Sequence, residues 1–356
     1  MSSSGDRDAV AGGSLGQKAD CLAVPFGFLP PSYARRLSTA AVIHLFHEEL
    51  AYEILAYANN LPRGTNLFIS TDTPLKKERI ERVFLAYKFG SCEVVITPNR
   101  GRDIAPKLVG WRDVYERYEI VLHLHSKSSS HSRTLAHWRP YLYETLAGSR
   151  EQVLDVLGIF ERAPNVGMIF AQHYEPIRPY LTWGANHAAA SALSERMGHV
   201  LPSDHPLDFP SGSMFWARSA ALKPLLDLRL SFDDFPDEIG QVDSTPAHAI
   251  ERLYAIACEL ARFDWLKIAR PELLADAGAA LNVPDAGVLD RFVATELVRL
   301  TSSAAIAPID RESLSEPPPA LAAIAARHRD WALAAEKFGL WTKAPLHPWG
   351  PWASRY

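Results

Sequence analysis

The sequence is short of cysteine and of long apolar runs, and both shortages narrow the class of protein. Its 356 residues include only three cysteines, Cys21, Cys92 and Cys258, and their spacing matches neither a disulfide framework nor a metal site. This usage fits a reducing compartment. No apolar run approaches the length of a membrane span, and residues 1–23 lack the apolar core of a secretory signal. We therefore expect a cytoplasmic protein without a transmembrane segment.

A strong charge of either sign is also missing. The net charge is −4, so the basic excess that favours nucleic acid is absent, and we expect no nucleic-acid partner. Apolar residues make up 47% and charged residues 22%, which is typical of globular proteins. The chain is longer than one core usually needs. We predict a flexible leader over 1–37, an α/β domain over 38–268, and a helical C-terminal extension over 269–356 with a Pro- and Trp-rich tail.

Apolar, β-branched segments alternate with segments of helical periodicity in the first half of the domain. The pattern predicts four strands, at 40–46, 66–70, 94–97 and 118–124. It predicts helices between them at 48–61, 75–89 and 104–117. Such alternation indicates a mostly parallel sheet flanked by helices, of the Rossmann-like kind.

Polar residues gather where these predicted strands end. The segments Asn99–Asp103 and His123–Lys127 follow the third and fourth strands, and Asp72 follows the second. The carboxyl ends of parallel strands meet at one edge of a sheet, where open α/β sheets bind their ligands. We therefore predict a ligand site formed by these segments.

Each residue of the first segment also has a simpler interpretation. Asn99 and Gly101 alone would serve only to turn the chain. Arg102 pairs either with a phosphate group or with Asp103. Asp103 either binds a ribose or sugar hydroxyl or caps the helix that starts at Ile104, and the two roles are compatible.

The second segment raises the question of a metal. His123 and His125 alternate along a strand and so share one face. No third ligand stands at a suitable spacing from this pair, so we do not predict a metal site there. Lys127 is either a solvated loop residue or a phosphate contact, and we favour the phosphate contact.

The second half of the domain adds strands and an acidic loop. We expect strands at 166–171 and 213–216, an irregular aromatic-rich segment at 173–186, and helices at 138–157 and 245–262. A charge-rich loop is usually solvated, so its acids gain a role only from context. The acids of this loop and its flank are Asp233, Asp234, Asp237, Glu238 and Asp243.

Four blocks together are similar to the rhamnan synthesis protein F family, bacterial enzymes of cell-surface polysaccharide assembly. The resemblance covers roughly residues 40–265. The blocks are NRGRDIAPKL at 99–108, LHLHSKSS at 122–129, SGSMFWAR at 211–218 and FPDEIGQVDSTPAHAIERL at 235–253.

The stretch 94–127 also resembles the nucleotide-sugar half of GT-A glycosyltransferases, with Asn-Arg-Gly at 99–101 as their Asn-x-Gly turn. Where those enzymes have Asp-x-Asp, this chain has His-Ser-Lys at 125–127. Two carboxylates would hold a divalent cation that neutralises a diphosphate, whereas Lys127 would meet the diphosphate directly. A second departure is Asp-Ser-Thr at 243–245, where the family pattern is Asp-Gly-Thr.

The resemblance implies a GT-A-like fold and transfer of a sugar, with a deoxyhexose such as rhamnose as a candidate. The donor would be a nucleotide sugar, and the acceptor a growing surface glycan or lipid-linked glycan, such as lipopolysaccharide O-antigen. Other glycosyltransferases of the pathway would be partners, and peripheral attachment to the inner membrane is the alternative location. We expect an inverting, metal-independent enzyme without a cofactor. The rival interpretations are a retaining transferase and a non-catalytic glycan-binding or scaffold domain.

The resemblance also assigns roles to residues, each beside a plainer one. An inverting transfer needs a carboxylate that takes the proton of the acceptor hydroxyl, for which we prefer Glu238 and place Asp243 second. Asp243 alternatively caps the following helix, and Trp183 alternatively belongs to the core. Donor contacts are expected from Asp72, Asn99, Gly101, Arg102, Asp103, His125, Ser126 and Lys127. Acceptor contacts are expected from Trp183, Asn186, Ser211, Gly212 and Ser213, although the last three also suit the start of a strand.

Overall fold

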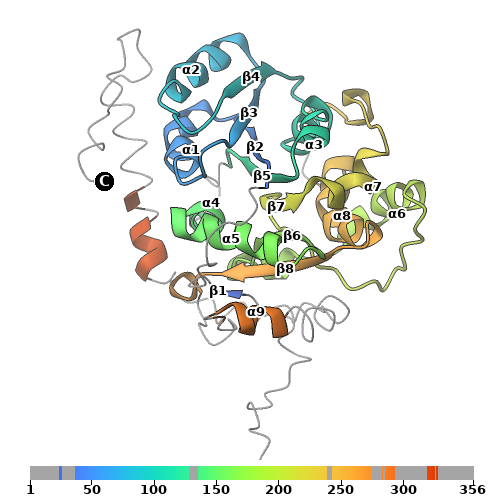
Figure 1. The fold of residues 1–356 in the computed structure, drawn as a ribbon. Coiled ribbons are helices and arrows are strands. Elements are labelled where there is room, and N and C mark those ends of the chain that lie inside the picture. The colour runs from blue at the N-terminus through green and yellow to red at the C-terminus, as the bar shows by residue number, and fades with distance from the viewer. Residues whose placement is uncertain are drawn as a thin grey trace, which may run out of the picture.

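The computed structural model describes residues 24–25, 37–127, 135–238, 243–274, 283, 285–292, 319–324 and 326–327. These residues contain one eight-stranded sheet, in which β7 alone runs antiparallel to its neighbours (Figure 1). The strands in sheet order are β1 (Val24–Pro25), β8 (Asp264–Ala269), β6 (Val166–Ala171), β7 (Phe215–Arg218), β5 (Ile120–His125), β2 (Thr39–His44), β3 (Asn66–Thr71) and β4 (Cys92–Ile96).

Helices cover both faces of this sheet because successive strand residues point to opposite sides. Ala41 and Ile43 of β2 belong to one core, and Ala40 and Val42 to the other. The first core is closed by α1 (Ala51–Ala58), α2 (Pro74–Phe84), α4 (Trp138–Ala147) and α5 (Arg150–Arg162). The second is closed by α3 (Val114–Arg117), α6 (His187–Arg196), α7 (Lys223–Leu226) and α8 (Pro246–Leu260). The predicted α/β class, a mostly parallel sheet flanked by helices, is confirmed.

Several predicted elements differ in detail, and local chemistry explains the differences. The helix expected over 104–117 is a π-helical turn, Pro106–Gly110, followed by the short α3. The helix expected over 138–157 is divided into α4 and α5, because Ser149 adopts an extended conformation and caps α5 through the Gln152 amide. Strand β8 was not predicted, since the buried but charged Lys267 interrupts its apolar pattern.

The two predicted terminal regions are described only in part. Within the leader, β1 pairs in parallel with β8. Within the C-terminal extension, α9 (Ala286–Phe292) and residues 319–324 are helical. The polar loop 128–134, the rest of the leader and the Pro- and Trp-rich tail lie outside the described residues. In the part of the chain that the structure describes, no helix combines the length and apolarity of a membrane span.

Candidate active site

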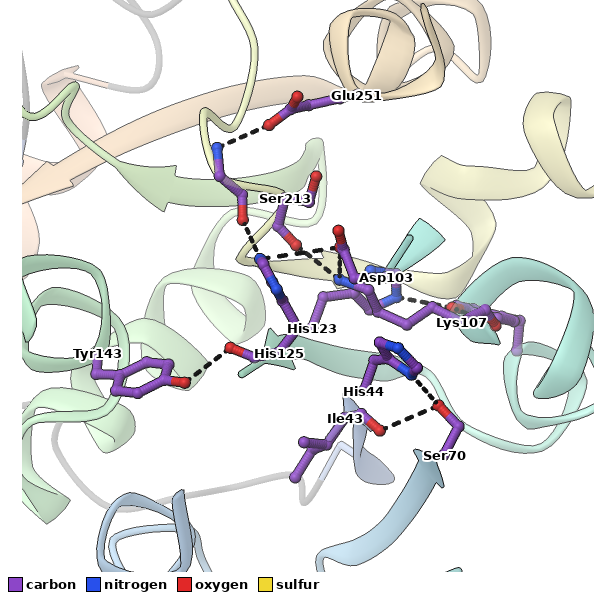
Figure 2. A network of polar contacts seen from close by, with 12 residues as sticks. Ile43, His44, Ser70, Asp103, Lys107, His123, His125, Tyr143, Ser213 and Glu251 are labelled. Atoms are coloured by element: carbon purple, nitrogen blue, oxygen red, sulfur yellow. Dashed lines mark hydrogen bonds and ion pairs between the residues drawn. The ribbon is translucent and has the colours of Figure 1, made fainter. Parts of the chain in front are cut away.

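The register of three neighbouring strands builds the floor of a cavity at their carboxyl ends. His44 of β2 pairs with Ser70 of β3 on one side and with His125 of β5 on the other. The Nδ1 atom of His44 lies 3.0 Å from the Ser70 hydroxyl. Figure 2 shows these side chains together with Asp103 and Lys107. The cavity above them measures about 350 Å³.

Most of the predicted donor residues line this cavity, although they come from segments far apart in the sequence. Two of the predicted acceptor residues, Gly212 and Ser213, also line the cavity, as does Glu238 of the acidic loop. The predicted donor residues in the lining are Asn99, Arg102, Asp103, His125, Ser126 and Lys127. The structure therefore brings these predicted site residues into one place.

Other predicted site residues lie outside the lining and have partners of their own. Asp72 forms an ion pair with Lys76, with 2.7 Å between Oδ1 and Nζ. The indole N–H of Trp183 donates to the His205 carbonyl at 2.9 Å. Trp183 is therefore fixed by the protein itself rather than turned toward the cavity.

Asn186 and Asp243 also lie outside the lining and are bonded to each other. The Asn186 amide donates to the Asp243 carboxylate at 2.9 Å and its carbonyl accepts the Ser244 N–H at 3.1 Å. Ser244 has a φ of 67°. Burial would raise the pKa of Asp243, but the hydrogen bonds from Asn186 and Ser244, together with the nearby Arg252 and His248, outweigh burial and lower the pKa. Asn186 thus stabilises the turn that leads into α8.

Gly101, a predicted donor residue, lies outside the lining and instead shapes the turn that precedes the lining residue Arg102. Its φ is 69°, and a Cβ atom there would lie 2.5 Å from the Cβ of Ala105 and 2.7 Å from the Phe235 ring. The next residue, Arg102, also has a positive φ, of 54°. Glycine is therefore needed for close packing at this turn.

The turn at Arg102 is joined to the acidic loop. The Arg102 N–H donates to Oε1 of Glu238 at 2.8 Å, and its guanidinium lies 3.9 Å from the same carboxylate. Arg100 contacts Asp237 at 2.8 Å, and the two residues form an isolated β-bridge. These contacts place Glu238 at the cavity, and sequence spacing alone could not have shown them.

A buried ion pair lies beneath the cavity. Nζ of Lys107 is 2.7 Å from Asp103 and donates to the Ser213 carbonyl at 2.9 Å, and the Lys107 side chain is 0% exposed. Burial lowers the pKa of Lys107, while Asp103 opposes this effect. Burial alone would raise the pKa of Asp103, but the neighbouring His125 imidazole and the ammonium group of Lys107 together outweigh burial and bring the pKa well below its usual range. Asp103 is therefore held ionised at the cavity.

The two histidines of β5 have different environments. Nε2 of His125 donates to the Gly212 carbonyl at 2.7 Å, at the cavity. His123 is fully buried, with its Nε2 atom 2.7 Å from the Tyr115 hydroxyl and its ring against Phe215. Among the described residues, no group of three or more histidine, cysteine or acidic side chains is arranged to hold a metal ion.

Lys127 reaches the cavity with little local compensation for its charge. Its Nζ atom lies 3.9 Å from the centre of the Trp138 ring. Burial lowers the pKa of Lys127, and Glu251 opposes that effect. Burial raises the pKa of Glu251, whose Oε1 atom accepts the Gly212 N–H at 2.8 Å. None of the described carboxylates comes within ion-pair distance of Lys127, so its charge is available to a ligand.

Several lining residues are not among the site residues that the sequence predicts, although for Glu251 it suggests a structural or diphosphate-neighbouring role. They include His44, Phe46, His47, His248 and Glu251. For the last two a signal existed, because they stand one turn apart near the start of α8. His248 lies 2.8 Å from the Thr245 hydroxyl and 4.0 Å from Asp243, so Asp243 neighbours a lining residue without lining the cavity itself.

The cavity histidines make the fold sensitive to acid. Burial lowers the pKa of His44 from 6.5 to about 3, and the pKa values of His125 and His248 to about 4. Between these values and 6.5 the unfolded chain binds more protons than the folded protein, so stability falls as the pH drops. Each group contributes up to about 1.4 kcal/mol per pH unit.

We therefore expect the free energy of unfolding to be highest above about pH 6.5 and to decrease steadily towards pH 4. Urea denaturation at pH 7.5, 6 and 5 would measure this dependence. An equal free energy of unfolding at all three pH values would contradict the neutral, buried state of these imidazoles.

Comparison with known proteins gives a family match over most of the predicted α/β domain. The family model described as rhamnan synthesis protein F matches residues 29–262. Two curated relatives, each called uncharacterized protein WxcX, come from Xanthomonas campestris pv. campestris strains B100 and ATCC 33913. Each is 37% identical over 223 residues, which is 62% of this chain and 31% of the relative. The chain thus spans about a third of the length of these relatives.

A solved structure was also found, the mannosyltransferase PcManGT from Pyrobaculum calidifontis in complex with GDP-Man and Mn2+. The similarity covers 89% of this chain and 90% of that chain, with 13% identity and a TM-score of 0.40.

Proposed function

The chain belongs to the rhamnan synthesis protein F family, and from this membership we infer that its cavity is the active site of a glycosyltransferase of polysaccharide synthesis. The donor is a nucleotide sugar, with a deoxyhexose such as rhamnose as the candidate sugar, and the acceptor is a glycan. The observation that carries this proposal is that two cationic side chains, Lys127 and Arg102, line a cavity at the carboxyl ends of parallel strands. Such an edge is where open α/β sheets bind ligands.

The two cations suit a diphosphate. Lys127 supplies a compact charge, and the half-exposed guanidinium of Arg102 can contact phosphate oxygens through two N–H groups. Asn99, His125 and Ser126 add polar groups beside them. The donor therefore lies with its diphosphate between Lys127 and Arg102.

Lys127→Ala should weaken binding of a nucleoside diphosphate about ten- to a hundredfold, because a hydrogen bond to a charged group is worth roughly 1.5–3 kcal/mol. Its unfolding free energy should change by only about 1 kcal/mol, the value of the lost contact with Trp138. Isothermal titration calorimetry and urea denaturation would measure the two effects.

Lys77→Ala is the matched control, since Lys77 is paired with Glu81 on the surface of α2. This variant should bind the nucleoside diphosphate like the wild type. If Lys127→Ala unfolds easily yet keeps full affinity, Lys127 has a structural role instead.

The carboxylates of the cavity do not fit a divalent metal. Asp103 is paired with Lys107, Glu238 accepts the Arg102 N–H, and Glu251 accepts the Gly212 N–H. Hard divalent cations need several free oxygen ligands. We therefore propose that the diphosphate is neutralised by protein cations alone.

Sugar transfer should accordingly keep most of its rate in excess EDTA, and added manganese should not raise it. The assay follows release of the nucleoside diphosphate from the donor. If EDTA abolishes sugar transfer and added manganese restores it, the proposal that Lys127 replaces a metal is wrong.

Glu238 is the residue we propose to take the proton of the acceptor hydroxyl, because of the two predicted acids it alone lines the cavity. Gly212 and Ser213 form the acceptor side of the cavity. Trp183 and Asn186, predicted as acceptor contacts, instead support the loops behind it. Asp243 remains the alternative proton acceptor.

The test of the function is direct. Nucleotide sugars are screened by thermal shift, because a preferred donor stabilises the folded protein by mass action. The best donor is then incubated with the protein and release of the nucleoside diphosphate is measured. A protein that binds the donor but releases nothing, with or without a glycan acceptor, is a binding or scaffold domain rather than a transferase.

A further inference from the structure

Ser211 was predicted to contact the acceptor, yet its side chain points away from the cavity into a buried polar chain. Its hydroxyl lies 3.0 Å from Nδ1 of His173. The other ring nitrogen, Nε2, lies 2.8 Å from Asp208, whose second oxygen lies 2.6 Å from Nζ of Lys267. We call Lys267, Asp208, His173 and Ser211 the buried chain.

The burial of this chain is nearly complete. The exposed fractions are 3% for Lys267, 6% for Asp208, 0% for His173 and 4% for Ser211. Burial would raise the pKa of Asp208, but Lys267 and His173 outweigh it and lower the pKa to about 2. Burial also lowers the pKa of His173. A buried ion pair adds little net stability compared with an apolar pair, and in some proteins it serves to fix one conformation.

The direction of each hydrogen bond follows from these charges. Lys267 and Nε2–H of His173 both donate to the ionised Asp208. The neutral imidazole then offers its Nδ1 lone pair, so the Ser211 hydroxyl donates to it. The buried chain therefore fixes both the tautomer of His173 and the rotamer of Ser211.

The segment fixed by Ser211 carries the acceptor side of the cavity. Gly212 and Ser213 both have positive φ, 88° and 54°. A Cβ atom on Gly212 would lie 2.8 Å from Leu142. Positive φ at a serine persists only where the surroundings impose it. Here the surroundings act from two sides, because the buried chain binds Ser211, whereas residues at the cavity and the buried Lys107 beneath it bind Gly212 and Ser213.

From the cavity side, three residues bind the backbone of this segment. The Gly212 N–H donates to Glu251, the Gly212 carbonyl accepts from His125, and the Ser213 carbonyl accepts from Lys107. Figure 2 shows Glu251 and His125 approaching the segment from opposite sides. A displaced Gly212 would therefore move His125 and Glu251 as well.

We infer that the buried chain is a positioning device for the acceptor side of the active site, with Ser211 and His173 acting through the backbone of Gly212. The inference rests on the proposed function, because it assigns the positioned wall to the acceptor. Transfer depends on alignment of the reacting groups, and a displacement of about 1 Å can lower the rate about a hundredfold.

The first test is Ser211→Ala, which removes one hydroxyl and keeps the backbone. We expect faster hydrogen–deuterium exchange of the Gly212 amide and a rise of about ten- to a hundredfold in the acceptor KM. The affinity for the nucleoside diphosphate should change by less than about threefold, because Lys127 and Arg102, which carry the charge that binds it, do not contact Ser211.

Two further variants separate positioning from general stability. The double change Asp208→Asn with Lys267→Met removes both charges together, so neither is left buried alone, and it should raise the acceptor KM as Ser211→Ala does. When this double change is combined with Ser211→Ala, the acceptor KM should rise little further, because all three residues act through the hydrogen bond between His173 and Ser211. The control is Tyr57→Phe, which breaks the buried bond from Tyr57 to Glu144 at 2.9 Å on the other face of the sheet.

Tyr57→Phe should lower stability without changing either the acceptor KM or the exchange of Gly212. If active Ser211→Ala protein keeps wild-type exchange at Gly212 and a wild-type acceptor KM, the inference is overturned. If the wild-type protein transfers no sugar, the proposed function fails instead. Hydrogen–deuterium exchange of the Gly212 amide in Ser211→Ala then still decides whether the buried chain positions Gly212.

Discussion

Glu238→Gln is expected to lower the rate of sugar transfer by about a hundred- to ten-thousandfold while the affinity for the nucleotide donor stays unchanged. Glutamine keeps the shape of the side chain, and its amide oxygen can still accept the Arg102 N–H that now binds Oε1 of Glu238 at 2.8 Å. The amide cannot take the proton of an acceptor hydroxyl. The loss should therefore be in kcat rather than in donor binding.

Asp243→Asn is the matched control for this change. Asp243 is about half exposed, lies outside the cavity lining and is bonded to Asn186. The variant should retain most of the turnover, as measured by single-turnover release of the nucleoside diphosphate. A large loss in Asp243→Asn with little change in Glu238→Gln would transfer the proton-accepting role to Asp243. If neither change affects turnover, the acidic loop does not supply the base.

Lys107→Met should reduce the free energy of unfolding by about 3–5 kcal/mol, because it leaves the Asp103 carboxylate buried without its partner. The lysine is 0% exposed, and its two contacts, to Asp103 and to the Ser213 carbonyl, are both lost. Methionine has a similar length and fills the space, so the effect comes from charge rather than from volume. Urea denaturation at pH 7.5 measures it.

The control uses another lysine–aspartate pair at a spacing of four residues. Lys223 contacts Asp227 at 2.6 Å, but its side chain is 68% exposed. Lys223→Met should therefore change stability by less than about 1 kcal/mol. Adding Asp103→Asn to Lys107→Met should recover part of the loss, because no unpaired charge then remains. If Lys107→Met lowers the free energy of unfolding as little as Lys223→Met does, Asp103 is solvated and does not depend on Lys107.

The sequence alone was enough to predict six strands of the sheet and the edge at which the cavity forms. The runs at 40–46 and 118–124 have the β-branched, apolar character of buried parallel strands, and the structure confirms strands there. The periodicity of apolar residues depends only on neighbours in the chain, so it can be read from the sequence. The polar residues after each strand, such as Arg102 and Lys127, could also be assigned to one edge, because parallel strands end together.

Tertiary structure alone decided which of these polar residues face one another. Ser211 precedes Gly212 in the chain, yet Ser211 turns to the buried His173 while Gly212 lines the cavity, because two positive φ angles reverse the backbone there. Lys107 was part of a helical pattern, and only the approach of the segment at Ser213 makes it the partner of a carbonyl 106 residues away.

Glu238 and Asp243 illustrate the same division. They stand five positions apart in one acidic loop, and composition gave no means of choosing between them. The contact of Glu238 with the Arg102 backbone turns it to the cavity, while Asn186 keeps Asp243 outside. The sequence determines which residue types stand at the edge of the sheet, because strand and helix patterns depend on neighbours in the chain. The chemistry available to each one depends on contacts with distant segments, and those exist only in the folded protein.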